Sequence, residues 1–190
     1  MSAGRRISNV VGVDDAPFER EHRGDVPIVG AVFTRTRLDG VLIGRVRRDG
    51  ADATRGVATL IRGSPFHEHV QAVMLDGIAL AGFNVVDLEA LHETLERPVL
   101  VVTRKEPDLP AIRRALSTRV PGGDRKWRLI EKAGPMEPLE GVWVQRVGLD
   151  RPRAASMIRD TRAQGRLPEP LRVAHLIAGA LERGVSRGQA

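Results

Sequence analysis

Two aspartates stand where apolar, β-branched runs end, and such runs are typical of strands. Asp14 closes the run 9–14 (NVVGVD), and Asp76 follows the run 70–75 (VQAVML). If these strands are adjacent and parallel, both carboxylates lie at the carboxyl edge of one sheet, where α/β proteins commonly bind ligands. Paired carboxylates suit Mg²⁺ or Mn²⁺, which complete their coordination shell with water and phosphate. The pair therefore predicts a divalent-cation site suited to phosphodiester chemistry.

The same two aspartates also have an ordinary structural interpretation. Aspartate is common in turns and at helix caps, and Asp14 and Asp76 are each followed by residues that favour a loop. Any α/β protein supplies aspartates of this kind, so spacing alone favours the structural role. The choice between the two interpretations depends on the rest of the sequence.

The elements that must position these aspartates follow an order typical of a mixed α/β sheet. Three strand candidates come first, with a hairpin signal at Asp39–Gly40, and helices then alternate with buried strands. The right-handed crossover rule places the first and fourth strands side by side, with helices on both faces of the sheet. The predicted strands are 9–14, 26–36, 41–48, 70–75, 98–103 and 142–147, and the predicted helices are 53–62, 84–96, 108–116, 152–162 and 168–183, with a loop at 120–124 and an ambiguous piece at 127–132.

Length and composition set limits on the class of protein. The chain has 190 residues, of which 42% are hydrophobic, which is enough for one core, so we expect a single domain over 1–190. The absence of cysteine excludes disulfides, thiolate metal sites and a cysteine nucleophile. The N-terminal apolar stretch is too short for a signal peptide or a membrane span, so we expect a cytoplasmic protein.

The net charge is +6, and much of the excess lies near the C-terminus. Residues 151–190 hold eight arginines against three acidic residues. Such a surplus fits a nucleic-acid-binding surface and an ordinary solvated face about equally well. If the segment does bind nucleic acid, Arg166 and Arg172 are the expected contacts.

Three segments together resemble endonuclease V and its uncharacterised prokaryotic relatives. They are 11–18 (VGVDDAPF), 73–82 (VMLDGIALAG) and 167–177 (LPEPLRVAHLI), and the resemblance extends over nearly the whole chain. The stretches 49–54 and 82–91 look closer to the uncharacterised relatives than to endonuclease V itself. The resemblance implies a ribonuclease H-like fold.

The resemblance also implies a Mg²⁺- or Mn²⁺-dependent nuclease acting on DNA or RNA. Asp14 and Asp76 would be metal ligands, Lys105 a phosphate neighbour, and His175 a residue near the metal or the scissile phosphate. Endonuclease V has a glutamate between its two aspartates; no glutamate matches it here, and Asp52 is the nearest replacement. The chain also has no tyrosine, so the tyrosine-containing wedge of endonuclease V, and its recognition of deaminated bases, are not carried over.

The final predicted helix gives His175 a direction. Its apolar side contains Leu171, Ala174 and Ala178, and His175 belongs on or beside that stripe. We expect His175 to be at least partly buried and to point toward the Asp14/Asp76 edge. A hydrogen-bonded core histidine is the alternative.

Three functions remain open at this stage. The leading hypothesis is a metal-dependent phosphodiesterase, the second is a nucleic-acid-binding module with altered catalysis, and the third is a small-molecule phosphate hydrolase. The other polar residues that attract notice are given ordinary roles: Asp15 as a turn residue, His67 and His69 as loop residues, Asn84 as a helix cap, and Glu169 with Arg172 as an intrahelical pair.

Overall fold

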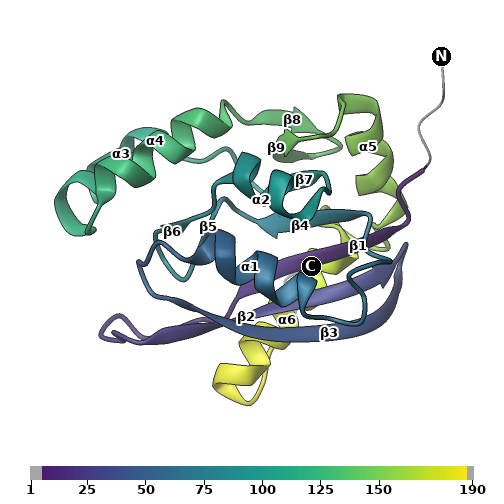
Figure 1. Ribbon diagram of the computed structural model, residues 1–190, viewed down its shortest axis with the longest axis horizontal. Coiled ribbons are helices and arrows are strands. Elements are labelled where there is room, and N and C mark those ends of the chain that lie inside the picture. The colour runs from purple at the N-terminus through teal and green to yellow at the C-terminus, as the bar shows by residue number, and fades with distance from the viewer. Residues whose placement is uncertain (1–5, 188–190) are drawn as a thin grey trace.

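A seven-stranded mixed sheet with helices on both faces forms the centre of the computed structural model, which describes residues 6–187 (Figure 1). The strand order is β3-β2-β1-β4-β7-β9-β8, and a separate two-stranded ribbon pairs β5 with β6. The strands are β1 (Asn9–Asp15), β2 (Asp25–Thr34), β3 (Arg37–Arg47), β4 (Ala72–Asp76), β5 (Ala79–Leu80), β6 (Asn84–Val85), β7 (Val99–Thr103), β8 (Glu137–Leu139) and β9 (Val142–Val147). The helices are α1 (Ala53–Arg62), α2 (Leu88–Leu95), α3 (Leu109–Arg119), α4 (Gly123–Ala133), α5 (Arg151–Asp160) and α6 (Glu169–Arg183).

The first and fourth strands are adjacent and parallel, as the element order predicts. β1 pairs with β4 from Val10↔Ala72 to Val13↔Leu75, and β4 pairs in parallel with β7. On the other side, β1, β2 and β3 form the antiparallel meander. The carboxyl ends of β1, β4 and β7 therefore share one edge of the sheet.

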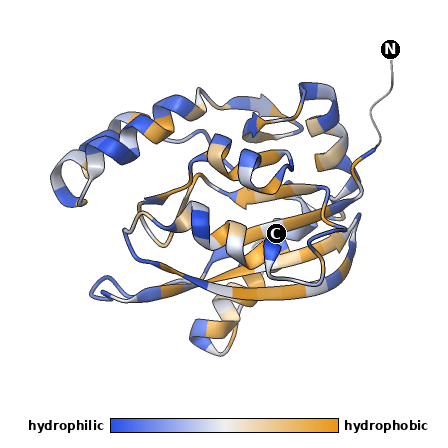
Figure 2. Cartoon of the chain, viewed as in Figure 1, coloured by the Kyte–Doolittle hydropathy of each residue, from blue (hydrophilic) through white to orange (hydrophobic). Residues whose placement is uncertain are grey.

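Alternating side chains divide the core between the two faces of the sheet. Val11 and Val73 belong to the cluster that contains the apolar residues of α1 and α2, whereas Val10 and Met74 pack with α5 and the start of α6. Figure 2 shows the apolar character of these central strands. Because Asp14 and Asp76 continue the second set along their strands, their side chains lie on the face covered by α5 and α6.

Gly12 allows α6 to lie directly on β1. A Cβ atom at this position would overlap the backbone of Pro170, in the first turn of α6. Only glycine permits this close approach without moving the helix. The fit fixes α6 above the strand that carries Asp14.

The β2–β3 turn does not lie at Asp39–Gly40, where the sequence signal places it. Those two residues are inside β3, and the turn is at Arg35 and Thr36, with Arg35 at a φ of 57°. Gly40 has a packing role instead, because a Cβ atom there would overlap the ring of Phe66. The glycine marks a close contact, and the turn prediction was wrong.

Two further segments differ from the predicted pattern. The predicted helix 84–96 is a short strand followed by the helix α2, which begins after Asp87; the Asp87 side chain accepts a hydrogen bond from the Ala90 amide. The ambiguous piece 127–132 is the central part of α4, which packs against α3 to form a helical hairpin projecting beyond the sheet (Figure 1). Among the described residues, no helix is long and apolar enough to cross a membrane.

Candidate metal centre

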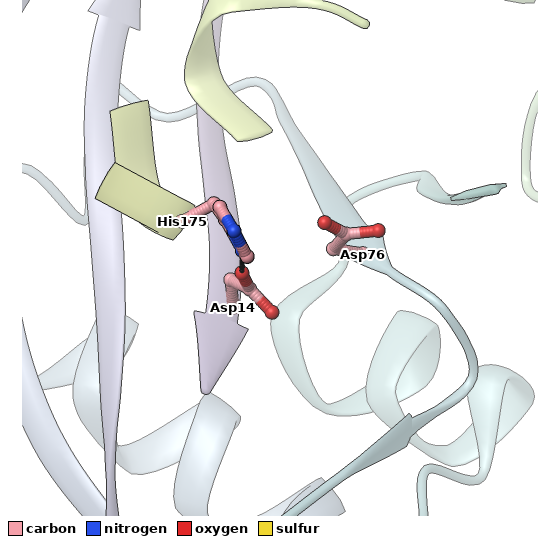
Figure 3. Close-up of side chains that lie close together, drawn as sticks. All are labelled: Asp14, Asp76 and His175. Carbon is pink, nitrogen blue, oxygen red and sulfur yellow. Dashed lines mark hydrogen bonds and ion pairs between the residues drawn. The ribbon is translucent and has the colours of Figure 1, made fainter. Parts of the chain in front are cut away.

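Three elements bring Asp14, Asp76 and His175 together (Figure 3). Asp14 lies near the end of β1, Asp76 is the last residue of β4, and His175 lies in the middle of α6. Each side chain offers one possible ligand atom, and the three atoms lie within 4.8 Å of one another. The arrangement requires the parallel β1–β4 pair and the close packing of α6 on Gly12.

Hydrogen bonds hold the Asp14 carboxylate on both oxygens. His175 Nδ1 lies 2.8 Å from Asp14 Oδ2, and the backbone amide of Asp15 donates to Asp14 Oδ1 over 2.9 Å. The Asp14 side chain is only 8% exposed, whereas that of His175 is 52% exposed. His175 therefore points toward the aspartates but is more open to solvent than its place beside the apolar stripe suggests.

The two carboxylates repel each other in a poorly solvated position. Burial, and then the charge of Asp14, raise the pKa of Asp76 to about 6. The hydrogen bond that His175 donates to Asp14 raises the pKa of His175 above its ordinary value, and the negative charges of Asp14 and Asp76 act in the same direction. A positive charge between these groups would relieve the repulsion.

The donor set fits a divalent cation. The carboxylate oxygens of Asp14 and Asp76 suit Mg²⁺ or Mn²⁺, whereas a structural zinc site normally has four protein ligands. Burial and the charge of Asp14 raise the pKa of Asp76 more than the charges of His175 and Arg104 lower it. Mutual proximity, burial and ligand type therefore agree with a cation-binding role.

Asp15 is a third acidic group near the centre that the turn interpretation underestimates. It is the last residue of β1, and burial, followed by the charge of Asp14, raises its pKa to about 7. A backbone hydrogen bond from Ala81 acts in the opposite direction. Its position directly after Asp14 was visible in the sequence, but its burial depends on the loop after β4.

Asp52 lies outside the cluster formed by Asp14, Asp76 and His175. It precedes α1, and its Oδ1 accepts hydrogen bonds from Asn84 Nδ2 (2.6 Å) and from the Arg47 amide (3.1 Å). These bonds tie the end of β3 to the ribbon β5–β6. Asp52 thus has a structural environment in this geometry and does not supply the glutamate missing from the chain.

The basic side chains that follow β7 do not lie as expected, since Lys105 was the predicted phosphate neighbour. Lys105 is exposed, and its carbonyl accepts a hydrogen bond from Thr103 Oγ1. The charge that acts on the centre belongs to the preceding residue, Arg104, which lowers the pKa of both Asp76 and His175. Sequence reasoning missed Arg104 because an adjacent lysine matched the endonuclease V pattern.

The remaining candidates have structural roles, and all but Asn84 have the role expected of them. Glu169 and Arg172 form the expected intrahelical pair, at 2.7 Å. His67 lies 4.0 Å from Glu68 in the loop before β4. Asn84 is fully buried and does not cap the helix that follows it, which Asp87 caps; instead its Oδ1 accepts a hydrogen bond from the Ala53 amide at the start of α1, and its Nδ2 donates to Asp52.

A cleft of about 650 Å³ opens beside the centre. Asp14, Asp15 and His175 line one part of it, and Arg183 and Arg187 line another. A second cavity of about 790 Å³ lies between α1, α2 and α4 and is lined in part by Arg55, Arg125 and Lys126. Basic side chains therefore surround hollows near the carboxyl edge.

The arginine surplus of the C-terminal segment is partly neutralised. Arg151, Arg159 and Arg172 form ion pairs with Glu137, Glu140 and Glu169. By contrast, the α3–α4 hairpin exposes five arginines for which no ion pair occurs among residues 6–187: Arg113, Arg114, Arg119, Arg125 and Arg128. The basic surface is thus broader than the sequence count of the C-terminal segment indicated.

Comparisons with known proteins identify relatives over nearly the full chain. The model of the endonuclease dU family matches residues 6–182. A UPF0215 protein from Deinococcus radiodurans is 56% identical over 184 residues, covering 97% of this chain and 94% of that protein. A UPF0215 protein from Methanothermobacter thermautotrophicus is 42% identical over 185 residues, covering 95% and 91% of the two chains.

Solved structures identify the fold. The crystal structure of a protein of unknown function from Archaeoglobus fulgidus matches with a TM-score of 0.85 and 29% identity, covering 92% of this chain and 98% of that one. Endonuclease V from Bacillus subtilis matches with a TM-score of 0.58 and 13% identity, covering 96% and 85%. Endonuclease V from Ciona intestinalis, in complex with DNA containing an inosine followed by a ribo-adenosine, matches with a TM-score of 0.58 and 12% identity, covering 88% and 83%. The predicted ribonuclease H-like fold is confirmed.

Proposed function

Because the chain belongs to the endonuclease dU family, we propose that it is a divalent-metal-dependent endonuclease that hydrolyses phosphodiester bonds in DNA containing deoxyuridine. The observation that carries this proposal is the convergence of Asp14, Asp76 and His175 from three separate elements. Turn-forming or helix-capping aspartates have no reason to meet a histidine 161 positions away. The family's name supplies the substrate class, and the centre supplies the reaction class.

Asp14 and Asp76 would hold the cation in this proposal. A bound divalent ion supplies Lewis-acid chemistry and offsets the negative charge of a phosphodiester. The hydrogen bonds on Asp14 from His175 and from the Asp15 amide keep its carboxylate in one orientation. Asp76 reaches the same point from the neighbouring strand, so the two ligands are fixed by the sheet register.

His175 has the position of a general acid. Its Nδ1 donates to Asp14, and its Nε2 has no hydrogen-bond partner among residues 6–187 and belongs to a half-exposed ring at the cleft. The hydrogen bond to Asp14 and the nearby negative charges raise the pKa of His175, so they favour the protonated form of the ring over the neutral one. As water attacks phosphorus and the bond to the leaving sugar oxygen breaks, the protonated Nε2 donates its proton to that oxygen.

The surface charge supports a nucleic-acid substrate. The exposed arginines of the α3–α4 hairpin extend the basic surface beyond the carboxyl edge, where a polyanion longer than one nucleotide would contact them. A small phosphate ester bound at the centre would not contact the arginines of this hairpin. This observation favours a polynucleotide over a small-molecule substrate.

The test is cleavage of end-labelled oligonucleotides that differ at one position. Strands containing deoxyuridine, thymidine or deoxyinosine are incubated with Mn²⁺, Mg²⁺ or EDTA, in single-stranded and duplex form. We expect metal-dependent cleavage of the deoxyuridine strand, loss of cleavage in EDTA, and loss in the Asp76→Asn variant. Tight binding without cleavage would support a catalytically altered binding module, and equal cleavage of all strands would refute the deoxyuridine assignment.

A further inference from the structure

The chain reverses direction directly after α6. Gly184 ends the helix in the left-handed conformation, with a φ of 70°, and its amide donates to the Ala180 carbonyl. Residues 185–187 then return along the helix, so that Ser186 lies against Gly179. We call residues 184–187 the return segment.

Gly179 provides the seat for the return segment. A Cβ atom at this position would lie 2.6 Å from Ser186 Oγ and 3.2 Å from Ser186 Cβ. Both distances are shorter than normal packing allows, so the return segment depends on the absence of a side chain here. His175, Gly179 and Arg183 follow one another at four-residue intervals and therefore share one face of α6.

This geometry brings two arginines to the candidate metal centre. Arg183 from the helix and Arg187 from the return segment line the same cleft as Asp14, Asp15 and His175. Among residues 6–187, no ion pair involves Arg183 or Arg187, although two acidic residues line this cleft. Arg151, Arg159 and Arg172 of the same segment do form such pairs, and Arg183 and Arg187 are the arginines of the segment that line this cleft.

We propose that Arg183 and Arg187 form a phosphate-binding rim that holds the DNA backbone beside the metal centre. This proposal rests on the proposed nuclease function and adds the contact that positions the strand. A guanidinium group presents paired donors that match the oxygens of a phosphodiester. The carboxylates at one side of the cleft would repel the same backbone, and the rim compensates for that repulsion where the strand enters.

The rim is tested by DNA binding at several salt concentrations. The Arg183→Ala/Arg187→Ala variant and the parent are titrated with a fluorescein-labelled 24-nucleotide DNA strand containing one deoxyuridine, in Ca²⁺ to slow cleavage. We expect roughly tenfold weaker binding, and a salt slope smaller by about 1.4, since a single-stranded phosphate contact contributes about 0.7. The Arg6→Ala/Arg37→Ala variant removes the same charge from the amino edge of the sheet and should bind within twofold of the parent, since that edge lies away from the cleft.

Two substitutions at the contact between Gly179 and Ser186 test whether the position of the return segment matters for DNA binding, without removing charge. Gly179→Ala should displace Ser186 and weaken DNA binding by about threefold, and adding Ser186→Gly should restore the parent affinity, because it removes the two atoms that a Cβ would meet. Thermal unfolding of each variant checks that the fold is kept. Failure of the second substitution to restore binding would contradict the role of the return segment.

The outcomes separate this proposal from the proposed function. A parent protein that neither binds nor cleaves the strand refutes the nuclease function itself. A parent that cleaves, with unchanged affinity and salt slope in the double arginine variant, refutes the rim alone. If the double arginine variant binds Mn²⁺ more tightly than the parent and its salt slope is unchanged, Arg183 and Arg187 act only on the charge of the carboxylates, and the rim is refuted.

Discussion

Two polar clusters that contain aspartates lie at the carboxyl edge of the sheet, on opposite faces. The first consists of Asp52, Asn84 and the Arg47 backbone, and the second of Asp14, Asp76 and His175. On the α1 face, Asp52 accepts hydrogen bonds from the Asn84 amide group and from the backbone of Arg47. On the α6 face, Asp14 and Asp76 lie close together, and the repulsion raises the pKa of Asp76. Neutral donors therefore satisfy the first cluster, whereas the second needs a positive charge.

The difference gives a criterion for separating structural from functional aspartates in this fold. When amide groups of the chain donate hydrogen bonds to a carboxylate, its hydrogen-bonding capacity is satisfied without a bound ion. A buried carboxylate placed against another one is destabilised unless a proton or a cation enters. By this criterion Asp52 belongs to the architecture, and we propose that Asp14 and Asp76 belong to the chemistry.

The largest expected effect comes from exchanging one carboxylate of each cluster for an amide. Asp76→Asn should lower the rate of DNA cleavage by about 10³-fold, because several kcal/mol of transition-state stabilisation depend on the bound cation. Asp52→Asn should leave the rate within tenfold of the parent. Single-turnover cleavage with saturating Mn²⁺ measures both, and an equal loss in the two variants would remove the distinction.

His175→Ala should reduce cleavage by roughly 10²-fold, the usual contribution of a general acid. Mn²⁺ affinity, measured by calorimetry, should change much less than in Asp76→Asn. The pH–rate profile should also lose the limb in which activity falls as His175 deprotonates. An unchanged profile, or a loss of metal binding equal to that of Asp76→Asn, would make His175 a ligand rather than a proton donor.

The pH dependence of stability should differ between the clusters when no metal is present. Asp76 has an ordinary pKa of 3.8 when unfolded and about 6 when folded, so the folded state binds the proton more tightly and stability falls as pH rises from about 4 to 7. The raised pKa of His175 adds a loss in the same direction above its ordinary value of 6.5. The contribution of Asp76 amounts to roughly 2–3 kcal/mol.

Urea denaturation in EDTA at a series of pH values measures this dependence. Asp76→Asn should reduce the slope between pH 4 and 7 without abolishing it, because burial also raises the pKa of Asp15 to about 7. Carboxyls with lowered pKa, such as Asp160, lose their stabilisation only below about pH 4, outside this window. Mn²⁺ should stabilise the parent more at pH 7 than at pH 5, and the opposite order would contradict the cation-binding role.

The smallest effect is expected from the structural cluster. Asn84→Ala removes the donors and the acceptor that join Asp52, Arg47 and Ala53, so the free energy of unfolding should fall by about 1–3 kcal/mol. The folded fraction should keep the parent cleavage rate. Ser117→Ala, at an exposed position, should change stability by less than about 0.5 kcal/mol and serves as the matched control.

Local pattern was sufficient to predict the part of the centre that strands carry. Asp14 and Asp76 each follow a run of buried residues, and the order of elements fixes the two strands as parallel neighbours. The direction of His175 followed from its place beside the apolar stripe of α6, together with the resemblance to endonuclease V. Its 52% exposure did not follow, because exposure depends on the cleft that the return segment borders.

Other features depend on contacts that no local pattern records. Gly40 looks like a turn residue, but the ring of Phe66, distant in sequence, occupies the space its side chain would need. Asp52 has the right residue type for a ligand, but Asn84 from the β5–β6 ribbon engages it on the other face of the sheet. Both errors arise from partners more than twenty positions away.

The 161-residue separation of His175 from Asp14 also affects how the centre assembles while the chain is being synthesised. At a synthesis rate of 5–20 residues per second, roughly 8–32 s pass between the appearance of the aspartate and that of the histidine. Once Asp76 has also been made, the growing chain holds both carboxylates without the imidazole and without the helix that packs on Gly12. A ribosome-bound fragment that ends before α6 therefore carries an incomplete centre.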